Sequence, residues 1–230
     1  QVDEVQAYND GMSMMNMGNM SAMTTANNAL AANNFNNADR DKTDTLVDVN
    51  VLANYQVTLY DELQLGLARK SRAPNLYERY SWGVSNMAST MIGWYGDANG
   101  YIGNPNLKAE TAHTISATYS KTAKNDAWRV SANMWYTDVT DYIDADIVRS
   151  FNSYGLANTT RNILSFTNVD ATLYGAKLDI SKALYQSRQF GEWVLTANVT
   201  STRGKRDDTN QPLYQIKPLH TALSLSQQIG

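Results

Sequence analysis

The chain has 230 residues, no cysteine and a formal net charge of −3 at pH 7, so a disulfide framework and a thiolate metal site are excluded. A surface this close to neutral also argues against nucleic acid as a partner, because phosphate binding requires a basic surface. No apolar run approaches the roughly 18 residues of a transmembrane helix, and the first residues do not resemble a signal peptide.

A methionine-rich stretch lies near the start of the chain. Residues 11–23 read GMSMMNMGNMSAM and hold six of the nine methionines. The thioether sulfur is a soft ligand that suits Cu(I) or Ag(I), and the M-x-M and M-x-x-M spacings allow several sulfurs to converge on one ion. Polar residues and glycine interrupt the run, which argues against a buried apolar face. Two alternatives to a metal site stay open. One is a flexible loop whose composition has drifted without function, since the following residues 24–37 are rich in Asn and Ala. The second is a protein-contact surface.

The first clear strand signal covers residues 46–59. Between Val47 and Leu59 every odd position is apolar or aromatic, and the even positions are mostly polar. A period of two is typical of a β-strand with two different faces and not of a helix. The same alternation recurs in 127–141, 170–182, 192–200 and 219–229. We expect about eight strands in all and no amphipathic helix.

The connections between the predicted strands alternate between short and long. The short ones lie at 60–62, 123–126 and about 185–191, and the longer ones at about 10–45, 73–109, 142–160 and 207–213. In an up-and-down meander this alternation places all short turns at one end and all long loops at the other. Outer-membrane β-barrels have this asymmetry, with short periplasmic turns and long extracellular loops. A Greek-key sandwich has no reason to sort its loops in this way.

The aromatic residues agree with a barrel that spans a membrane. Those near the short turns are Tyr60, Tyr119, Trp128, Tyr185 and Trp193, and those near a long loop are Trp135, Tyr136 and Tyr142. Trp128 and Tyr136 share one face about 26 Å apart along the strand. With a tilt near 40° this becomes about 20 Å, slightly short of the ~25 Å band between aromatic girdles. The alternative is that these residues lie in strands only because Tyr and Trp have a general preference for β-structure.

The opposite face of these strands carries Asn, Gln, Thr, Ser and Asp, as a water-filled lumen requires. The sequence therefore predicts an all-β, antiparallel, up-and-down transmembrane β-barrel in contact with the lipid bilayer.

Two further stretches read GLARKSRAPNLYERY (66–80) and GNPNLKAETAHTISATYS (103–120). Both resemble segments in the barrel of TonB-dependent outer-membrane receptors. That family commonly carries S-R-A-P, followed by G-N-P-x-L-K-P-E leading into a strand, and Ala109 stands where it usually has proline. VDATLYGAKLDISKAL (169–184) and PLYQIKPLHTALSLSQQ (212–228) resemble the strands that typically follow.

Within that family, residues 78–108 are most similar to the copper receptor branch, whose members have a similar loop rich in Trp, Met and Gly. The resemblance implies a bacterial outer-membrane receptor for TonB-dependent uptake of copper. It also implies a 22-stranded barrel around an N-terminal plug. Residues 1–230 would then supply about eight strands, with the plug, the TonB-contacting N-terminal region and the C-terminal closing strands absent. The alternative is a complete eight-stranded barrel with an adhesive or structural role, since barrels of that size exist.

The loop assignment puts the methionine-rich stretch on the extracellular side, together with Met87 and Met91 of the next long connection. The candidate copper ligands are Met12, Met14, Met15, Met17, Met20, Met23, Met87 and Met91. Copper is expected as the transported ligand and not as a resident cofactor. Met87 and Met91 have an alternative role in ordinary packing, because Trp82 and Trp94 are near in the sequence. Met134, on the apolar side of a predicted strand, is expected to face lipid.

Two further classes stay open. An iron–siderophore receptor of the same fold would rely on Arg, Tyr and Trp at the loop mouths, and the candidates are Arg72, Tyr77, Arg79 and Trp82. A soluble β protein is the other class.

Catalysis has no support in the sequence, so we do not expect an enzyme. His113 and His220 lie in different predicted strands, with no nucleophile or second ligand assigned to either. An acidic cluster lacks the central glycine and closing glutamate of a calcium loop and is expected to form a solvated loop rim. Its members are Asp138, Asp141, Asp144 and Asp146.

Overall fold

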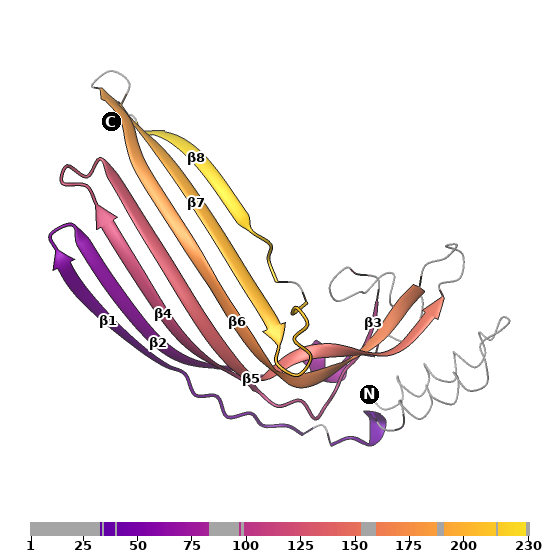
Figure 1. Ribbon diagram of the computed structural model, residues 1–230. Helices are drawn as coiled ribbons and strands as arrows, with labels where there is room; N and C mark the ends of the chain where they lie inside the picture. The colour runs from indigo at the N-terminus through magenta and orange to yellow at the C-terminus, as the bar shows by residue number, and fades with distance from the viewer. Residues whose placement is uncertain are drawn as a thin grey trace. The chain divides into compact units, whose positions relative to one another are not determined.

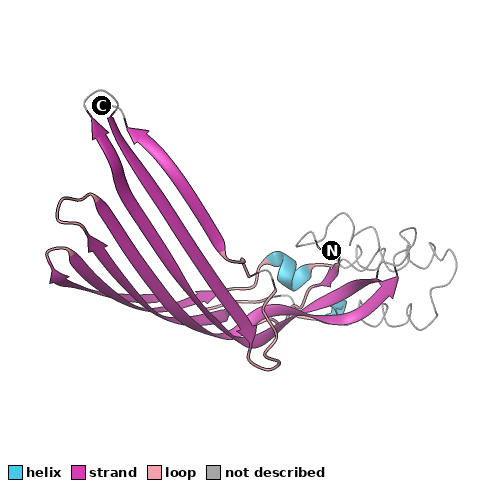
Figure 2. Cartoon of the chain, turned by 45° about the horizontal axis from the view of Figure 1, so that its top comes forward, coloured by secondary structure: helices cyan, strands magenta, loops and turns pink. Residues whose placement is uncertain are grey.

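The computed structural model describes residues 33, 35–39, 41–82, 97, 99–152, 160–187, 191–214 and 216–228. In chain order its elements are β1 (Val49–Thr58), β2 (Asp61–Arg72), α3 (Leu76–Tyr80), β3 (Gly100–Ile102), β4 (Glu110–Thr122), β5 (Trp128–Asn152), β6 (Thr160–Ser187), β7 (Gly191–Arg206) and β8 (His220–Gln228). Strands dominate, as predicted, and α3 is a helix of a single turn (Figure 2). Within these ranges no helix is long and apolar enough to cross a membrane.

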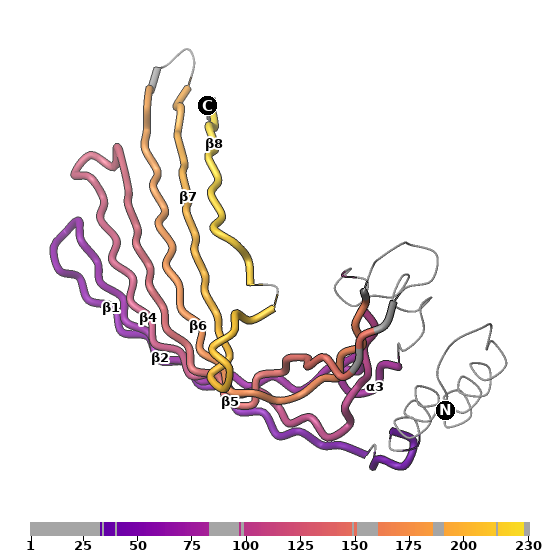
Figure 3. Tube along the Cα trace, turned by 45° about the vertical axis from the view of Figure 1, so that its right-hand side comes forward, coloured from indigo at the N-terminus to yellow at the C-terminus, as the bar shows by residue number. Residues whose placement is uncertain are grey.

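The strands form one sheet in the order β1-β2-β4-β5-β6-β7-β8, with β3 paired to β6 (Figure 1). Each long strand therefore lies beside the next one along the chain, and the tube in Figure 3 can be followed from β1 to β8 through this meander. The pairs β1–β2, β2–β4, β4–β5, β6–β7 and β7–β8 are antiparallel. The predicted antiparallel up-and-down order is confirmed.

Two of the predicted short connections and two of the predicted long ones lie where the sequence placed them. Residues 59–60 join β1 to β2, and residues 123–127 join β4 to β5. Residues 73–109 separate β2 from β4 and contain α3 and β3, and residues 207–219 separate β7 from β8. At these four connections the turn lengths agree with the up-and-down order of the barrel prediction.

The long loop predicted at residues 142–160 is wrong, because β5 continues to Asn152 and β6 begins at Thr160. The physical reason lies at Asp141, which has a φ of 56° inside β5. Its backbone N–H donates to Asp170 Oδ1 at 3.1 Å. This irregularity, with the carboxylates around it, interrupts the alternation of apolar and polar residues while the strand itself continues.

The described residues divide into two compact units. The first lies within Gln1–Asp44, Pro74–Lys108 and Ala145–Thr167, and the second within Thr45–Ala73, Ala109–Asp144 and Asn168–Gly230. The second unit contains most of the long sheet. The first contains α3, β3 and parts of β5 and β6.

One face of the sheet in the second unit is apolar and exposed. Residues directly opposite one another on neighbouring antiparallel strands share a face, and the register gives such rows across β1, β2, β4 and β5. One row is Val51, Leu67, Ile115 and Tyr136, and the next is Ala53, Leu65, Ala117 and Met134. Leu67 is 59% exposed and Met134 65% exposed. An apolar sheet face of this extent is suited to lipid, and Met134 lies on it as predicted.

The other face is polar and its side chains bond across the strands. The cross-strand pairs are Asn54–Gln64 at 2.8 Å, Thr118–Asn133 at 2.7 Å, Thr114–Thr137 at 2.9 Å and Ser120–Ser131 at 3.0 Å. Trp135 lies on this polar face and not in an aromatic girdle, because its ring packs over Gly175. Tyr142 is not a girdle residue either, since it packs against the buried cluster of Val139, Ala171 and Leu213. These two aromatic assignments from the sequence are therefore corrected.

The apolar face ends in polar residues beside the short turns. Asp61, at the start of β2, is 8% exposed. Its carboxylate accepts hydrogen bonds from Thr58, from Tyr119 and, at 2.8 Å, from Lys121 Nζ. Three donors satisfy this carboxylate, so a buried charge is tolerated where the apolar face stops.

Candidate functional site

All eight methionines predicted as copper ligands lie outside the described residues. They are Met12, Met14, Met15, Met17, Met20, Met23, Met87 and Met91. The structure does describe the chain next to both stretches, since Phe35 follows the first and Trp82 precedes the second. Phe35, Trp82 and the residues packed around them form the candidate site, and all belong to the first unit.

Phe35 and Trp82 contact each other through their rings. The ring centroids are 5.5 Å apart at an interplanar angle of 48°, within the range favoured by aromatic pairs. Phe35 is 8% exposed, and Trp82 is also joined to Ile102 by an antiparallel bridge. The contact holds the chain after the first methionine-rich stretch against the chain that enters the second.

The same unit contains a second group of packed aromatic rings. Tyr101 of β3 and Phe166 of β6 are fully buried and stack at 5.5 Å and 27°. Tyr77 of α3 meets the Phe166 ring edge-on at 6.1 Å. The parallel pairing of β3 with β6 brings these rings together, so α3 and β3 are fixed against β6 by packed aromatic surface.

The N-terminal end of α3 is stabilised by a capping box, and near its C-terminal end Gly103 packs against the helix backbone. Asn75 and Glu78 form a capping box, with each side chain accepting the other's backbone N–H at 2.8 Å. After the helix, Gly103 N donates to Ser81 O at 2.7 Å. A Cβ on Gly103 would lie 2.5 Å from the Arg79 carbonyl carbon. Only glycine allows the chain directly after β3 to approach the backbone of α3 this closely.

Arg79 links α3 to the chain that follows the methionine-rich stretch. It is 7% exposed, and its Nη2 donates to Asp44 Oδ1 at 2.8 Å and to Leu107 O at 3.2 Å. Lys42 adds a weaker contact to Asn106 Oδ1 at 3.5 Å. Within the described part of the chain, Arg79 Nε, Ser81 Oγ and Trp82 Nε1 are buried without a hydrogen-bond partner. The candidate site thus includes a buried ion pair, between Arg79 and Asp44.

The residues proposed for a siderophore site are already engaged in structural contacts. Arg72 pairs with Glu110 through two bonds, both of 2.8 Å. Arg79 is buried against Asp44, and Trp82 packs on Phe35. Arg72 belongs to the second unit, whereas Tyr77, Arg79 and Trp82 belong to the first. Within its own unit, each of Arg72, Arg79 and Trp82 is therefore occupied by a structural partner.

The acidic residues expected at a loop rim lie instead within β5, which is a correction to the sequence analysis. They are Asp138, Asp141, Asp144 and Asp146. Asp144 pairs with Arg206 Nη1 at 3.4 Å, and Asp141 is held through its backbone by Asp170 and Asn168. In the ranges that the structure describes, no group of three or more His, Asp or Glu side chains is arranged to hold a metal ion.

Sequence reasoning missed the roles of Phe35, Tyr101 and Phe166. Asn75-x-x-Glu78 is a recognisable capping signal, and it would have placed the start of α3. No local pattern could have paired Phe35 with Trp82, because 47 residues separate them.

Comparison with known proteins identifies the family. The family model described as TonB dependent receptor-like, beta-barrel matches residues 19–227. Heme/hemopexin utilization protein C of Haemophilus influenzae strain 86-028NP is 29% identical over 151 residues, which cover 63% of this chain and 20% of that protein. The same protein from strain ATCC 51907 is 29% identical over 159 residues. The chain thus spans about a fifth of the length of these curated relatives.

Solved structures show the same fold at low identity. The copper transporter OprC gives a TM-score of 0.58 at 22% identity, over 81% of this chain and 25% of OprC. The siderophore receptor PirA from Pseudomonas aeruginosa gives 0.51 at 21% identity, over 72% of this chain and 28% of PirA. Together with the family match, these likenesses confirm the predicted all-β barrel class and outer-membrane location, in a family of receptors and not of enzymes. The chain belongs to the TonB-dependent receptor family and forms part of its β-barrel in the bacterial outer membrane.

Proposed function

We propose that this chain is part of a TonB-dependent receptor that captures copper at the cell surface. In this mechanism the metal binds at the extracellular side and passes through the lumen when TonB, energised from the inner membrane, rearranges the plug. The copper ligands are methionine sulfurs, which suit Cu(I), from Met12 to Met23 and from Met87 and Met91. Copper is the cargo in this proposal and not a resident cofactor.

The contact between Phe35 and Trp82 carries this proposal. Met23 lies 12 residues before Phe35, and Met87 lies five residues after Trp82. An extended chain reaches about 3.5 Å per residue, so these spans reach at most about 40 Å and about 17 Å. Because both chains depart from one aromatic contact, sulfurs from both stretches are able to reach a common ion. The buried pair of Arg79 and Asp44 supports the proposal by fixing that point of departure.

Haem is the second candidate cargo, and the curated relatives favour it. Those relatives are named as heme/hemopexin utilization proteins and share 29% identity with the chain. Haem iron accepts imidazole or thioether ligands, so methionine in a surface loop is compatible with either cargo. A siderophore has less support, because Arg72 and Arg79 are paired with Glu110 and Asp44.

The test is a binding titration on the full-length receptor purified in detergent. One variant changes the six methionines of residues 11–23 to leucine, and a control variant carries Met134→Leu on the apolar face. Each protein is titrated with Cu(I) against a chromophoric chelator and, separately, with haem followed by its absorption spectrum.

We expect the six-leucine variant to bind fewer Cu(I) ions while Met134→Leu matches the wild type. Equal Cu(I) binding by all three proteins would make the methionine-rich stretch irrelevant to copper. Haem binding without Cu(I) binding would replace copper by haem as the cargo.

A further inference from the structure

The β7–β8 loop, residues 207–214 and 216–219, returns to the sheet of the second unit after the chain leaves β7 (Figure 1). Leu213 N donates to Gly204 O at 3.0 Å, and Lys205 and Pro212 form an antiparallel bridge. The Leu213 side chain is 4% exposed. Leu213 and the apolar residues packed with it form the Leu213 cluster. Its other members are Val139, Ala171, Ala112, Tyr142, Leu173 and Ile216.

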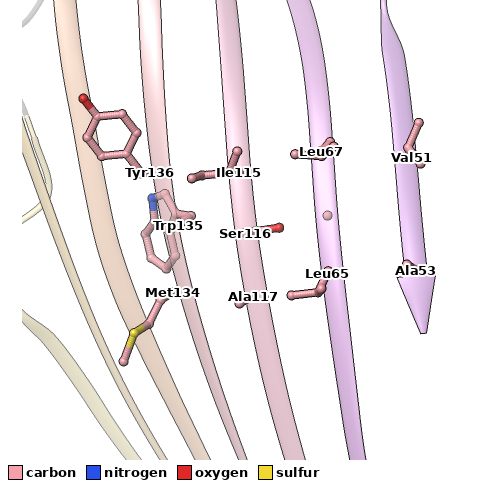
Figure 4. A pocket seen from close by; sticks show the side chains of 11 residues that line it. Val51, Ala53, Leu65, Leu67, Ile115, Ser116, Ala117, Met134, Trp135 and Tyr136 are labelled. Carbon is pink, nitrogen blue, oxygen red and sulfur yellow. The ribbon is translucent and has the colours of Figure 1, made fainter. Parts of the chain in front are cut away.

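The Leu213 cluster lies on the polar face of the sheet. The register pairs Ala112 with Val139 and, four residues along each strand, Ser116 with Trp135, which lie side by side in Figure 4. Residues an even number apart on a strand share a face, so Ala112 and Val139 are on the same face as Trp135. The polar face of an outer-membrane barrel lines the lumen. The β7–β8 loop therefore packs on the lumen side of the sheet.

Gly204 on β7 leaves space for the loop. It lies opposite Leu173 of the Leu213 cluster in the pairing of β6 with β7. A Cβ on Gly204 would lie 2.8 Å from Leu213 Cδ1 and 3.1 Å from Ile216 Cδ1. A larger residue at this position would push both side chains away from the sheet. The strand thus has no side chain at the point where the loop packs on it.

Polar contacts fix the start of the β7–β8 loop. Thr172 Oγ1 donates to Asp207 Oδ1 at 2.8 Å, and Asp207 N donates to Asp170 O at 2.9 Å. Arg206 N donates to Gln211 O at 2.9 Å. The sequence of the connection, DDTNQPLYQIKPL, has two prolines and no glycine, which limits its backbone freedom. The loop is therefore held both at its start and at Leu213, and its composition is not that of a hinge.

We propose that the β7–β8 loop is a fixed constriction of the lumen that limits the size of the solutes that reach the lumen wall beyond it. Gly204 lies at the end of β7 remote from Gly191, where the short connection from β6 ends. Short turns are periplasmic in outer-membrane barrels, so the constriction is at the extracellular end. A connection that only joined two strands would need no apolar contact with a polar lumen wall. The contact is made within the chain, so the constriction is present without cargo and is independent of the cargo proposed above.

The test measures how fast thiol reagents of two sizes reach the lumen wall. Cells express the full-length receptor with any native cysteine replaced by serine. Thr200→Cys places a thiol on the lumen face of β7, about 13 Å from Gly204 at ~3.3 Å per residue. Thr209→Cys is the matched reference, because Thr209 is exposed on the loop itself. A small sulfonated maleimide and a maleimide with a long polyethylene glycol chain are each added outside the cells.

Two variants remove the loop from the sheet, each combined with Thr200→Cys. Leu213→Asp places a carboxylate in the Leu213 cluster, and Gly204→Leu fills the space that the loop occupies. The matched control is Gln211→Asp, because the Gln211 side chain is exposed in the same loop. Heat-modifiable migration in gels checks that each variant folds.

With the native loop, we expect the small reagent to label both thiols and the bulky reagent to label Thr209→Cys much faster than Thr200→Cys. Leu213→Asp and Gly204→Leu should each speed bulky labelling of Thr200→Cys about tenfold, because the apolar burial that holds the loop is lost. Gln211→Asp should leave it unchanged.

Equal bulky labelling of Thr200→Cys and Thr209→Cys would overturn the proposal without any loop variant, so the test stays valid if the loop variants do not fold. Unchanged bulky labelling in folded Leu213→Asp and Gly204→Leu would overturn it too. So would a Thr200→Cys thiol that the small reagent does not label, since an element other than the loop would then close the lumen.

Discussion

The indole of Trp135 occupies the space into which a side chain on Gly175 would project. A Cβ placed on Gly175 would lie 2.2 Å from Trp135 Cζ2 and 2.6 Å from the Ser201 carbonyl oxygen. β5 and β6 are neighbours in the sheet, so the largest side chain of the polar face rests where its neighbour has none. The absence of a side chain at Gly175 is thus a packing requirement and not a need for backbone freedom.

Gly175→Ala should therefore destabilise the barrel, although alanine is a small residue. The methyl group is too close to both the Trp135 ring and the Ser201 carbonyl oxygen, so both must shift. Such overpacking costs about 1–3 kcal/mol. The measurement is the thermal midpoint of heat-modifiable migration of the full-length receptor. Ala176→Val is the control, because Ala176 is exposed on the apolar face. Identical midpoints for Gly175→Ala and the wild type would mean that Trp135 does not pack over Gly175.

Glu110 joins three strands at one point. It accepts two bonds of 2.8 Å from Arg72 and a third, of 2.7 Å, from the backbone N–H of Ile143. Glu110→Gln should cost about 1–2 kcal/mol, since it weakens three hydrogen bonds to a carboxylate whose side chain is only 12% exposed. Arg72→Gln should cost less, because the Arg72 side chain is 46% exposed and the bond from Ile143 survives.

The comparison of these two variants is made by urea unfolding of the receptor in detergent, with Glu62→Gln on the polar face as the control. A larger loss for Arg72→Gln than for Glu110→Gln would show that the bond from Ile143 contributes little to stability.

Asp44→Asn should loosen the first unit around α3. Arg79 and Asp44 are mostly buried, with side-chain exposures of 9% and 17%. Removing one charge leaves the other unpaired, which costs about 3 kcal/mol for a buried pair. Hydrogen exchange should therefore accelerate in residues 76–82 and 100–107 and stay unchanged in β7. Lys177→Gln serves as the control, since its pair with Asp179 is exposed on both sides and surface pairs contribute about 0–1 kcal/mol. If exchange in residues 76–82 and 100–107 of Asp44→Asn is as slow as in the wild type, the pair does not anchor this unit.

The division of the sheet into an apolar and a polar face was accessible from the sequence. Alternation at Val47–Leu59 is a local property of the chain, and short turns fix the register of antiparallel pairs. The same reasoning failed at Trp135. The alternation of the strand correctly places this residue on the polar face, but its aromatic side chain suggested a place in a membrane girdle. It failed again at Asp141, because a positive φ inside a strand interrupts the pattern without ending the strand.

The candidate site was far less accessible, because its contacts join residues distant in sequence. Arg79 looks like an exposed loop arginine until Asp44, 35 residues earlier, is placed beside it. The packing of Tyr77, Tyr101 and Phe166 likewise joins rings from three elements, α3, β3 and β6. Propensity and periodicity describe one element at a time, so they cannot report which side chains meet after three elements assemble.

Phe35→Ala tests whether the contact with Trp82 matters for copper, without removing any methionine. The substitution deletes an aromatic pair worth about 0.5–1.5 kcal/mol beyond its buried area. If both methionine-bearing stretches must depart from one point to share an ion, Cu(I) affinity should fall by about threefold to tenfold. The number of ions bound at saturation should stay the same, because every sulfur is still present. Leu76→Ala is the matched control, since Leu76 lies in the same unit and is 79% exposed. Unchanged Cu(I) affinity in Phe35→Ala, with a loss in the six-leucine variant, would mean that residues 11–23 bind copper without help from Met87 and Met91.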